Sequence, residues 1–186
     1  MDTASTSVLA KIAMQLLVGL SRSMILFTIS AGLSLILGVL RVPNVAHGSL
    51  YMIGAFAAYT VNMVIGGAAG FWLSLILAPL FVALVSFVAE RGLFCHLYER
   101  EHLMLLLFTF ALMLILGDAV KLLWGVEYKS VNAPDILKGS VTLFGLPFPT
   151  YNLFLLVVGP VVGFALWLFV NKTRIGKISK AAAVDR

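Results

Sequence analysis

The class of fold is decided by the stretch SMILFTISAGLSLILGVL, residues 23–40, which contains no charged side chain. Between Arg22 and Glu90 the only charged residue is Arg41. Hydrophobic residues make up 61% of the chain and charged residues only 11%, against about 25% charged residues in soluble domains. A helix needs about 20 apolar residues to cross the hydrocarbon core of a bilayer. The sequence therefore predicts an all-α integral membrane protein.

Further apolar stretches predict one polytopic domain, residues 1–186, with about five transmembrane helices. Pro43 disfavours helix at the residue before it, and GGAAG at residues 66–70 predicts a short hairpin link. Apolar residues at helical spacing from Leu9 to Leu20 predict an amphipathic helix at the membrane interface. The predicted elements are this interfacial helix at 7–20, transmembrane helices at 23–40, 45–65, 71–89, 103–124 and 151–170, an extracytoplasmic loop at 126–150 with a β-like run at 140–143, and a basic cytoplasmic tail at 171–186.

The Lys and Arg residues predict the orientation, because cytoplasmic loops are enriched in them. With five transmembrane helices, one side collects Arg41, Arg91, Arg100, Lys172, Arg174, Lys177, Lys180 and Arg186, and the other holds Lys11, Arg22, Lys121, Lys129 and Lys138. We therefore expect a cytoplasmic C-terminus and an extracytoplasmic N-terminus. These basic residues do not alternate with aromatic ones, which argues against a nucleic-acid partner.

The link before the second predicted helix, PNVAHGSLYMIGA at residues 43–55, combines a helix breaker, an amide and an imidazole in an apolar region. Polar groups at membrane depth need protein partners or a cavity to line. In one interpretation the chain dips into the membrane, the free amides that open the second helix attract a carboxylate, and His47 is a proton-sensitive lining residue. In the other, Pro43 and Asn44 make a cytoplasmic turn and His47 bonds to nearby backbone. The residues alone leave both open.

Small residues at helical spacing predict faces for close helix packing. Ser30, Ser34 and Gly38 recur every fourth residue, and Gly159 and Gly163 flank a proline that should loosen the backbone. The candidate packing residues are Ser30, Ser34, Gly38, Gly54, Gly159 and Gly163.

We expect no enzyme activity, no cofactor and no bound metal. The sequence contains no nucleophile-elbow serine and no Walker-type glycine loop, and its three histidines lie on separate segments without carboxylates at metal-ligand spacing. Cys95 is the single cysteine and cannot form an intrachain disulfide. Asp118 and Lys121, three residues apart near a helix end, predict an interfacial ion pair, with a proton or ion path as the alternative. Any energy source must therefore lie elsewhere.

Several stretches together resemble a known family. GLSLILGVLRVPNVAHGSLYMIGAF at residues 32–56 closely resembles the signature of the branched-chain amino acid ABC transporter permeases of the LivH type. So do LFTFAL at 107–112, LLWG at 122–125, TRIG at 173–176 and KAAAVDR at 180–186. The resemblance spans nearly the whole chain, and Asn-x-Ala-His-Gly at 44–48 is its most specific part.

The resemblance implies a permease of the bacterial inner membrane that imports leucine-like amino acids, urea or short amides. Its implied partners are a second permease, cytoplasmic ATP-binding subunits and an extracytoplasmic solute-binding protein. The substrate-pathway candidates are Asn44, His47, Gly48 and Tyr51, and the ATPase-docking candidates are Arg174, Gly176, Lys180, Ala182, Asp185 and Arg186. The family continues past this segment with further transmembrane helices, so the chain is expected to be the N-terminal portion of a longer permease. The alternatives are a non-transporting membrane scaffold or an inactive permease fragment.

Overall fold

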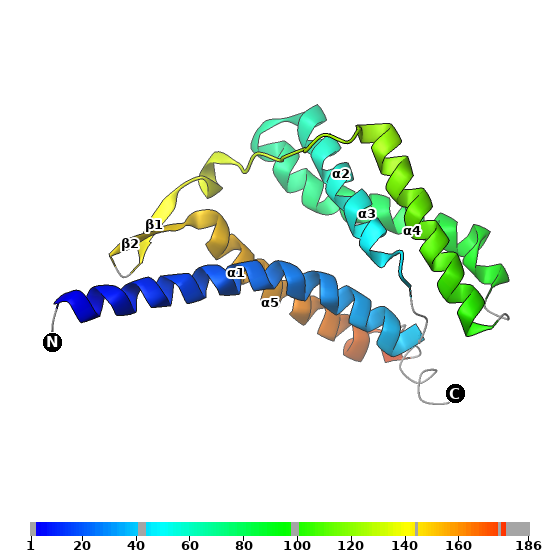
Figure 1. Ribbon diagram of the computed structural model, residues 1–186, viewed down its shortest axis with the longest axis horizontal. Coiled ribbons are helices and arrows are strands. Elements are labelled where there is room, and N and C mark those ends of the chain that lie inside the picture. Colours follow the sequence, from blue (N-terminus) through cyan, green and yellow to red (C-terminus); the bar gives the residue numbers. More distant parts are fainter. Residues whose placement is uncertain (1–2, 41–43, 98–100, 144, 175, 178–186) are drawn as a thin grey trace. The chain divides into compact units, whose positions relative to one another are not determined.

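The computed structural model describes residues 3–40, 44–97, 101–143, 145–174 and 176–177. Figure 1 shows its elements, which in chain order are α1 (Thr3–Leu40), α2 (His47–Ile65), α3 (Gly67–Gly92), η1 (Phe94–His96), α4 (His102–Trp124), η2 (Asp135–Leu137), β1 (Ser140–Leu143), β2 (Leu146–Pro149) and α5 (Thr150–Lys172). The five α-helices are long and apolar enough to cross a membrane. Contacts divide the chain into two compact units, one of Met1–Leu35 with Ala133–Arg186 and one of Ile36–Asn132.

The first helix corrects the sequence prediction. Residues 7–20 and 23–40 were expected to form two helices, but α1 continues through Ser21-Arg22-Ser23 without a break. The hydroxyls of Ser21 and Ser23 donate to the carbonyl oxygens of Val18 and Gly19 in the preceding turn, at 2.8 and 2.9 Å. These bonds satisfy the two hydroxyls inside the helix, and no glycine or proline interrupts it here. The interfacial location of residues 7–20 stays a prediction.

The link between α2 and α3 is shorter than the predicted hairpin at residues 66–70. Gly66 alone separates the two helices, with φ at +70°, a conformation that favours glycine. Gly70 lies in the first turn of α3, where an added Cβ would come within 3.2 Å of the Asn62 backbone. The glycines therefore permit a sharp turn and a close approach of the two helices.

In the unit of residues 36–132, α2 packs against both α3 and α4. Three hydrogen bonds join α2 and the residues before it to α4: Val45 to Thr109, Ser49 to Met113, and Trp124 to Thr60. Each pair is separated by 64 residues in the sequence. A constant separation means that α2 and α4 run parallel and in register, although α3 lies between them in the chain.

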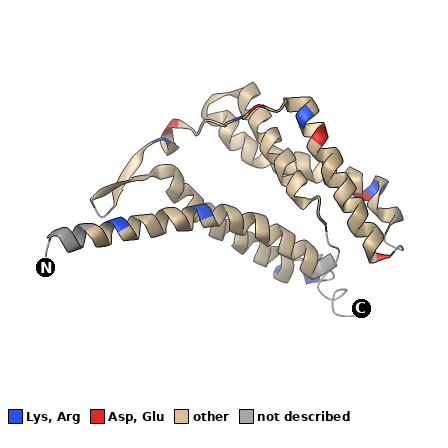
Figure 2. Ribbon diagram, in the orientation of Figure 1, with Lys and Arg blue, Asp and Glu red and all other residues tan. Residues whose placement is uncertain are grey.

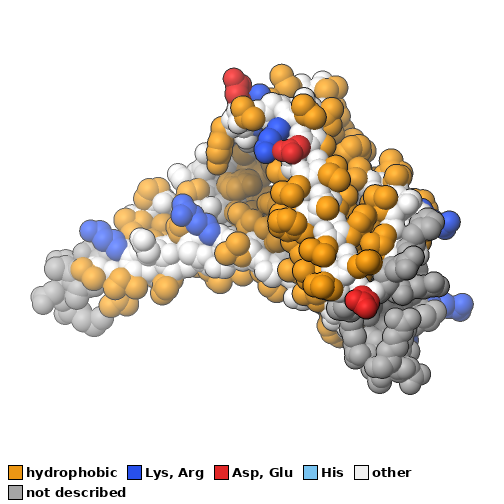
Figure 3. All heavy atoms as spheres, turned by 45° about the vertical axis from the view of Figure 1, so that its right-hand side comes forward, with side chains coloured by type: hydrophobic (Ala, Val, Ile, Leu, Met, Phe, Trp, Pro, Cys, Tyr) orange, Lys and Arg blue, Asp and Glu red, His pale blue; other side chains and the backbone are white. Residues whose placement is uncertain are grey.

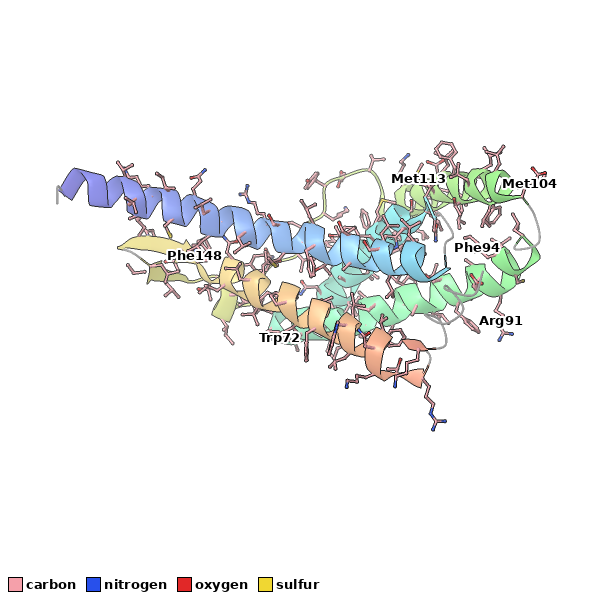
Figure 4. All side chains as sticks on the ribbon, turned by 90° about the horizontal axis from the view of Figure 1, so that it is seen from below. Trp72, Arg91, Phe94, Met104, Met113 and Phe148 are labelled. Atoms are coloured by element: carbon pink, nitrogen blue, oxygen red, sulfur yellow. The ribbon has the colours of Figure 1, made fainter. Side chains whose placement is uncertain are left out.

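In the other unit, α1 and α5 lie side by side, as Figures 1 and 4 both show. Met24 of α1 lies against Gly159 of α5, and Phe27 lies against Gly163. Before α5, β1 and β2 form an antiparallel hairpin whose Phe148 is fully buried, so the β-like run predicted at 140–143 is a strand. Lys138 donates to Asp135 at 2.8 Å, and this bond and the lysine charge hold the pKa of the Asp135 carboxyl below its ordinary value.

The surface of the chain is mostly apolar. Large hydrophobic side chains are exposed along all five helices, and few residues are fully buried. Charged residues are sparse along the ribbon in Figure 2, and hydrophobic side chains cover much of the face seen in Figure 3. Water would disfavour such a surface, whereas lipid chains solvate it.

Candidate functional site

The segment that precedes α2, residues 44–46, forms a corner, and a buried hydroxyl on α4 holds this corner by a hydrogen bond. The Val45 backbone N–H donates to Thr109 Oγ1 at 3.3 Å, and this hydroxyl donates in turn to the Leu106 carbonyl oxygen at 2.9 Å. Thr109 and Ala46 are both 0% exposed. A buried N–H without an acceptor costs about 1–3 kcal/mol. Thr109 therefore satisfies backbone that this non-helical segment would otherwise leave unpaired.

The corner lies alongside the interior of α4 and not at its end. Because the two helices are in register, His47 at the start of α2 is level with residue 111, about 12 Å along α4 from the start of its apolar stretch at Leu103. One turn into α2, the Ser49 hydroxyl donates to the Met113 carbonyl oxygen at 3.2 Å. The segment is thus hydrogen-bonded to α4 at a level where that helix is apolar.

The backbone and the side chain of Asn44 lie in different surroundings. Its carbonyl oxygen accepts from the His47 N–H at 3.3 Å, which makes the turn into α2. Its side-chain Oδ1 is buried and accepts no hydrogen bond from the described residues. The same side chain lines a cavity of about 190 Å³ between α2, α3 and α4. The backbone of Asn44 therefore forms a turn, while its amide faces a cavity.

The other pathway candidates lie on a different face of α2. Gly48 and Tyr51 are exposed and His47 is half-buried, and none of the three lines this cavity. An added Cβ at Gly48 would meet no atom within 4 Å. The structure thus places Asn44 in the interior of the unit, while Gly48 and Tyr51 lie on its surface.

The two docking candidates that the structure describes follow α5. Arg174 is exposed, whereas Gly176 is buried and its N–H donates to Thr173 Oγ1 at 3.0 Å. An added Cβ at Gly176 would collide with the backbone of Phe169 and Val170, which explains the glycine. The remaining docking candidates lie outside the described residues: Lys180, Ala182, Asp185 and Arg186.

The packing candidates differ in what they touch. An added Cβ at Gly159 would lie 2.5 Å from Met24 Sδ, one at Gly163 would lie 3.0 Å from the Phe27 ring, and one at Gly54 would lie 3.2 Å from Val82 Cγ2. Ser30, Ser34 and Gly38 are exposed, and an added Cβ at Gly38 would meet nothing within 4 Å.

The remaining candidates are charged and potentially metal-ligating residues. Asp118 and Lys121 form the predicted ion pair at 2.9 Å, and both side chains are exposed. Within the described residues, no three His, Cys, Asp or Glu side chains lie close enough to hold a metal ion. The side chains of His96 and His102 fall outside the described part.

Sequence reasoning missed Thr109, Ser49 and Met113, which hold the corner in place. Thr109 lies in LFTFAL, a stretch quoted for its resemblance, but a threonine in an apolar helix gives no physical signal of a partner 64 residues away. The one available signal was the need for an acceptor for the backbone N–H groups of a non-helical segment at membrane depth.

Residues 15–186 match the family described as "Branched-chain amino acid transport system / permease component". The chain is 27% identical to the high-affinity branched-chain amino acid transport system permease protein BraD of Pseudomonas aeruginosa, over 92% of this chain and 59% of that protein. It is 25% identical to the corresponding LivH of Salmonella typhimurium and 24% identical to LivH of Escherichia coli K12, in each case over 84% of this chain and 54% of the relative.

The chain thus spans 54% to 59% of the length of these curated relatives. No solved structure matches it. The five apolar helices and the family match agree on a multi-pass membrane protein. The chain belongs to the family of branched-chain amino acid transport system permease components.

Proposed function

We propose that this chain is the membrane-spanning permease subunit of an ATP-driven importer, in which it forms part of the translocation pathway and docks the ATPase. The observation that carries the proposal is the family match over residues 15–186. Three relatives are named as permeases of high-affinity branched-chain amino acid transport, so the proposed substrates are leucine-like amino acids, with urea and short amides as related candidates.

The corner before α2 supports a role in the pathway. It is a polar, non-helical segment hydrogen-bonded to the apolar part of α4, and such backbone is tolerated at membrane depth where protein satisfies it or a cavity adjoins it. Asn44 would act from the interior of the unit, and His47, Gly48 and Tyr51 would act from the surface of α2, where substrate or the second permease can reach them.

The proposed complex contains a second permease, two cytoplasmic ATP-binding subunits and an extracytoplasmic solute-binding protein, in the inner membrane of a bacterium. The distribution of Lys and Arg supports a cytoplasmic tail and an extracytoplasmic N-terminus. The tail segment from Arg174 to Arg186 would then face the ATPase. Its basic residues and Asp185 can form ion pairs with that partner.

Copurification with the ATP-binding subunits tests this role. The tagged chain should retain them, and reversing two charges with Lys180→Glu and Arg186→Glu should reduce the retained ATPase roughly tenfold, because each exposed ion pair contributes up to about 1 kcal/mol. The matched control reverses two lysines of the opposite side, Lys129→Glu and Lys138→Glu, and should leave retention unchanged. Failure of the unaltered chain to retain any ATPase would favour a non-transporting scaffold. Equal retention by both double variants would exclude docking through the tail.

A further inference from the structure

The cavity beside Asn44 has a chemical character that the proposed function does not specify. It lies entirely within the unit of Ile36–Asn132, with walls from the end of α1, the corner, α2, α3, η1 and α4. Its volume of about 190 Å³ is close to the roughly 150 Å³ that accommodates benzene and below the roughly 300 Å³ of drug-sized pockets. It is therefore suited to a ligand with about six to nine non-hydrogen atoms.

The polar groups of the cavity include two kinds of hydrogen-bond acceptor, an amide oxygen and a carboxylate. Asn44 Oδ1 is buried without a donor from the described residues, and such a group in a native structure calls for a missing partner. Ser86 and Glu90, one turn apart on α3, also line the cavity. Glu90 has a further interaction of its own, but a carboxylate offers about four lone-pair sites and can accept from a second donor. The partner that fits the Asn44 oxygen and the Glu90 carboxylate together is an N–H donor.

The negative charge of Glu90 in the cavity lining favours a ligand with a positively charged donor. Among the described residues that line the cavity, Glu90 is the charged one, and Lys and Arg are absent. A carboxylate ligand would therefore meet a like charge, whereas an ammonium group would meet an opposite charge and a free acceptor. Phe94 of η1, labelled in Figure 4, adds an aromatic wall, and ammonium groups are attracted to aromatic rings.

The rest of the lining is aliphatic. Leu50 of α2 and Leu112 and Leu116 of α4 line the cavity, and the two α4 residues are one turn apart on one helix face. These side chains give a branched hydrocarbon an apolar surface.

We propose that this cavity binds the ammonium group of a small aliphatic amine, with Asn44 and Glu90 as acceptors and the leucine side chains around its hydrocarbon. An amino acid in transit and a free alkylamine share this chemistry. That the ligand is a transported amino acid rests on the proposed function; the preference for an ammonium group does not.

Binding of radiolabelled 3-methylbutylamine to the chain in nanodiscs of neutral phosphatidylcholine tests the proposal. We expect saturable binding that unlabelled amine displaces and that 4-methylpentanoate, which has a carboxylate in place of the ammonium group, does not. Glu90→Gln and Asn44→Leu should each weaken binding roughly tenfold or more, because each removes an acceptor for a charged donor. Ala89→Phe should abolish binding by filling the cavity, which Ala89 lines.

Two control variants match these changes outside the cavity. Glu101→Gln alters an exposed glutamate, and Ala83→Phe alters an exposed alanine of α3, so both should bind like the unaltered chain. Absence of saturable binding, equal displacement by amine and acid, or equal binding by the Ala89→Phe and Ala83→Phe variants would each overturn the proposal. If the Ala89→Phe variant does not fold, amine binding by the Glu90→Gln variant tests the proposal instead. Binding as tight as that of the unaltered chain would overturn it.

Competition by leucine separates the two sources of the ligand. Displacement by leucine identifies an amino acid substrate, and displacement by the alkylamine alone identifies a free amine; both results uphold the ammonium site. ATP-driven uptake without amine binding overturns the cavity assignment alone. Amine binding without uptake overturns the proposed function alone.

Discussion

At the scale of single residues, the corner before α2 depends on Thr109. Its hydroxyl accepts from the Val45 N–H and donates to the Leu106 carbonyl oxygen, so one buried group serves a non-helical segment and a helix at once. Ala46 lies in a buried cluster with Phe94, Leu105 and Leu112, which packs the corner against α4. The hydrogen bond to Thr109 and the apolar packing of Ala46 therefore both hold Asn44 beside the cavity.

Thr109→Val should destabilise the unit of α2, α3 and α4. The substitution preserves the shape of the side chain but leaves the Val45 N–H without its acceptor, so we expect a loss of about 1–3 kcal/mol in the free energy of unfolding. Unfolding of the detergent-solubilised protein by SDS, followed by circular dichroism, measures this. The control is Thr28→Val, because Thr28 donates to Met24 of its own helix and should change stability by less than about 0.5 kcal/mol. Equal losses in both variants would contradict an anchoring role for Thr109.

The sequence was sufficient to locate the corner but not its partners. A proline, an asparagine and a histidine in an apolar stretch are visible as an anomaly without a structure. The partners of this segment are 64 residues away, and their position depends on how α2 packs on α4. The cavity was no more predictable, since Ser86 and Glu90 face Asn44 only once α3 has folded back along α2.

At the scale of elements, hydropathy was sufficient to locate the five helices. Their first and last residues also depend on local backbone and side-chain chemistry, which hydropathy does not describe. The helices predicted at 45–65, 103–124 and 151–170 are α2, α4 and α5, with ends that differ by two residues or fewer. The predicted helix at 71–89 starts earlier in α3, because Gly67 can adopt a positive φ at the sharp turn and Gly70 permits the close approach of Asn62. The division of α1 was wrong, because a charged residue between two serines does not end a helix whose hydroxyls bond within it.

The contact between α1 and α5 gives a prediction at this scale. Gly159→Ala should destabilise the contact by about 1–3 kcal/mol, because the new Cβ would lie 2.8 Å from Met24 Cβ and the two helices would have to separate. Adding Met24→Ala to this variant should recover part of the loss, which a double-mutant cycle of unfolding free energies measures.

Gly117→Ala is the control for the added methyl group. An added Cβ at Gly117 of α4 would meet no atom within 4 Å, so the substitution should be neutral or stabilise by up to about 1 kcal/mol through helix propensity. If Gly159→Ala were equally harmless, or if Met24→Ala gave no recovery, Gly159 would not set the approach of these helices.

At the scale of the whole molecule, the proposed orientation can be read at the single cysteine. Cys95 is exposed and lies in the polar loop between α3 and α4, which the proposal places in the cytoplasm. A membrane-impermeant maleimide should therefore label Cys95 in inside-out vesicles and not in intact spheroplasts. In a Cys95→Ser background, a cysteine introduced by Ser140→Cys in the exposed part of β1 should show the opposite pattern. Labelling of Cys95 in spheroplasts would reverse the proposed topology.

The account as a whole requires that the chain carry substrate across the membrane in an ATP-dependent complex. The most direct measurement is the uptake of radiolabelled leucine into proteoliposomes that contain this chain, the second permease, the ATP-binding subunits and the solute-binding protein, with urea and acetamide as parallel substrates. The account predicts uptake of at least one of these substrates that requires both ATP and this chain. Uptake of none of them, or uptake that persists when this chain is omitted, would contradict it.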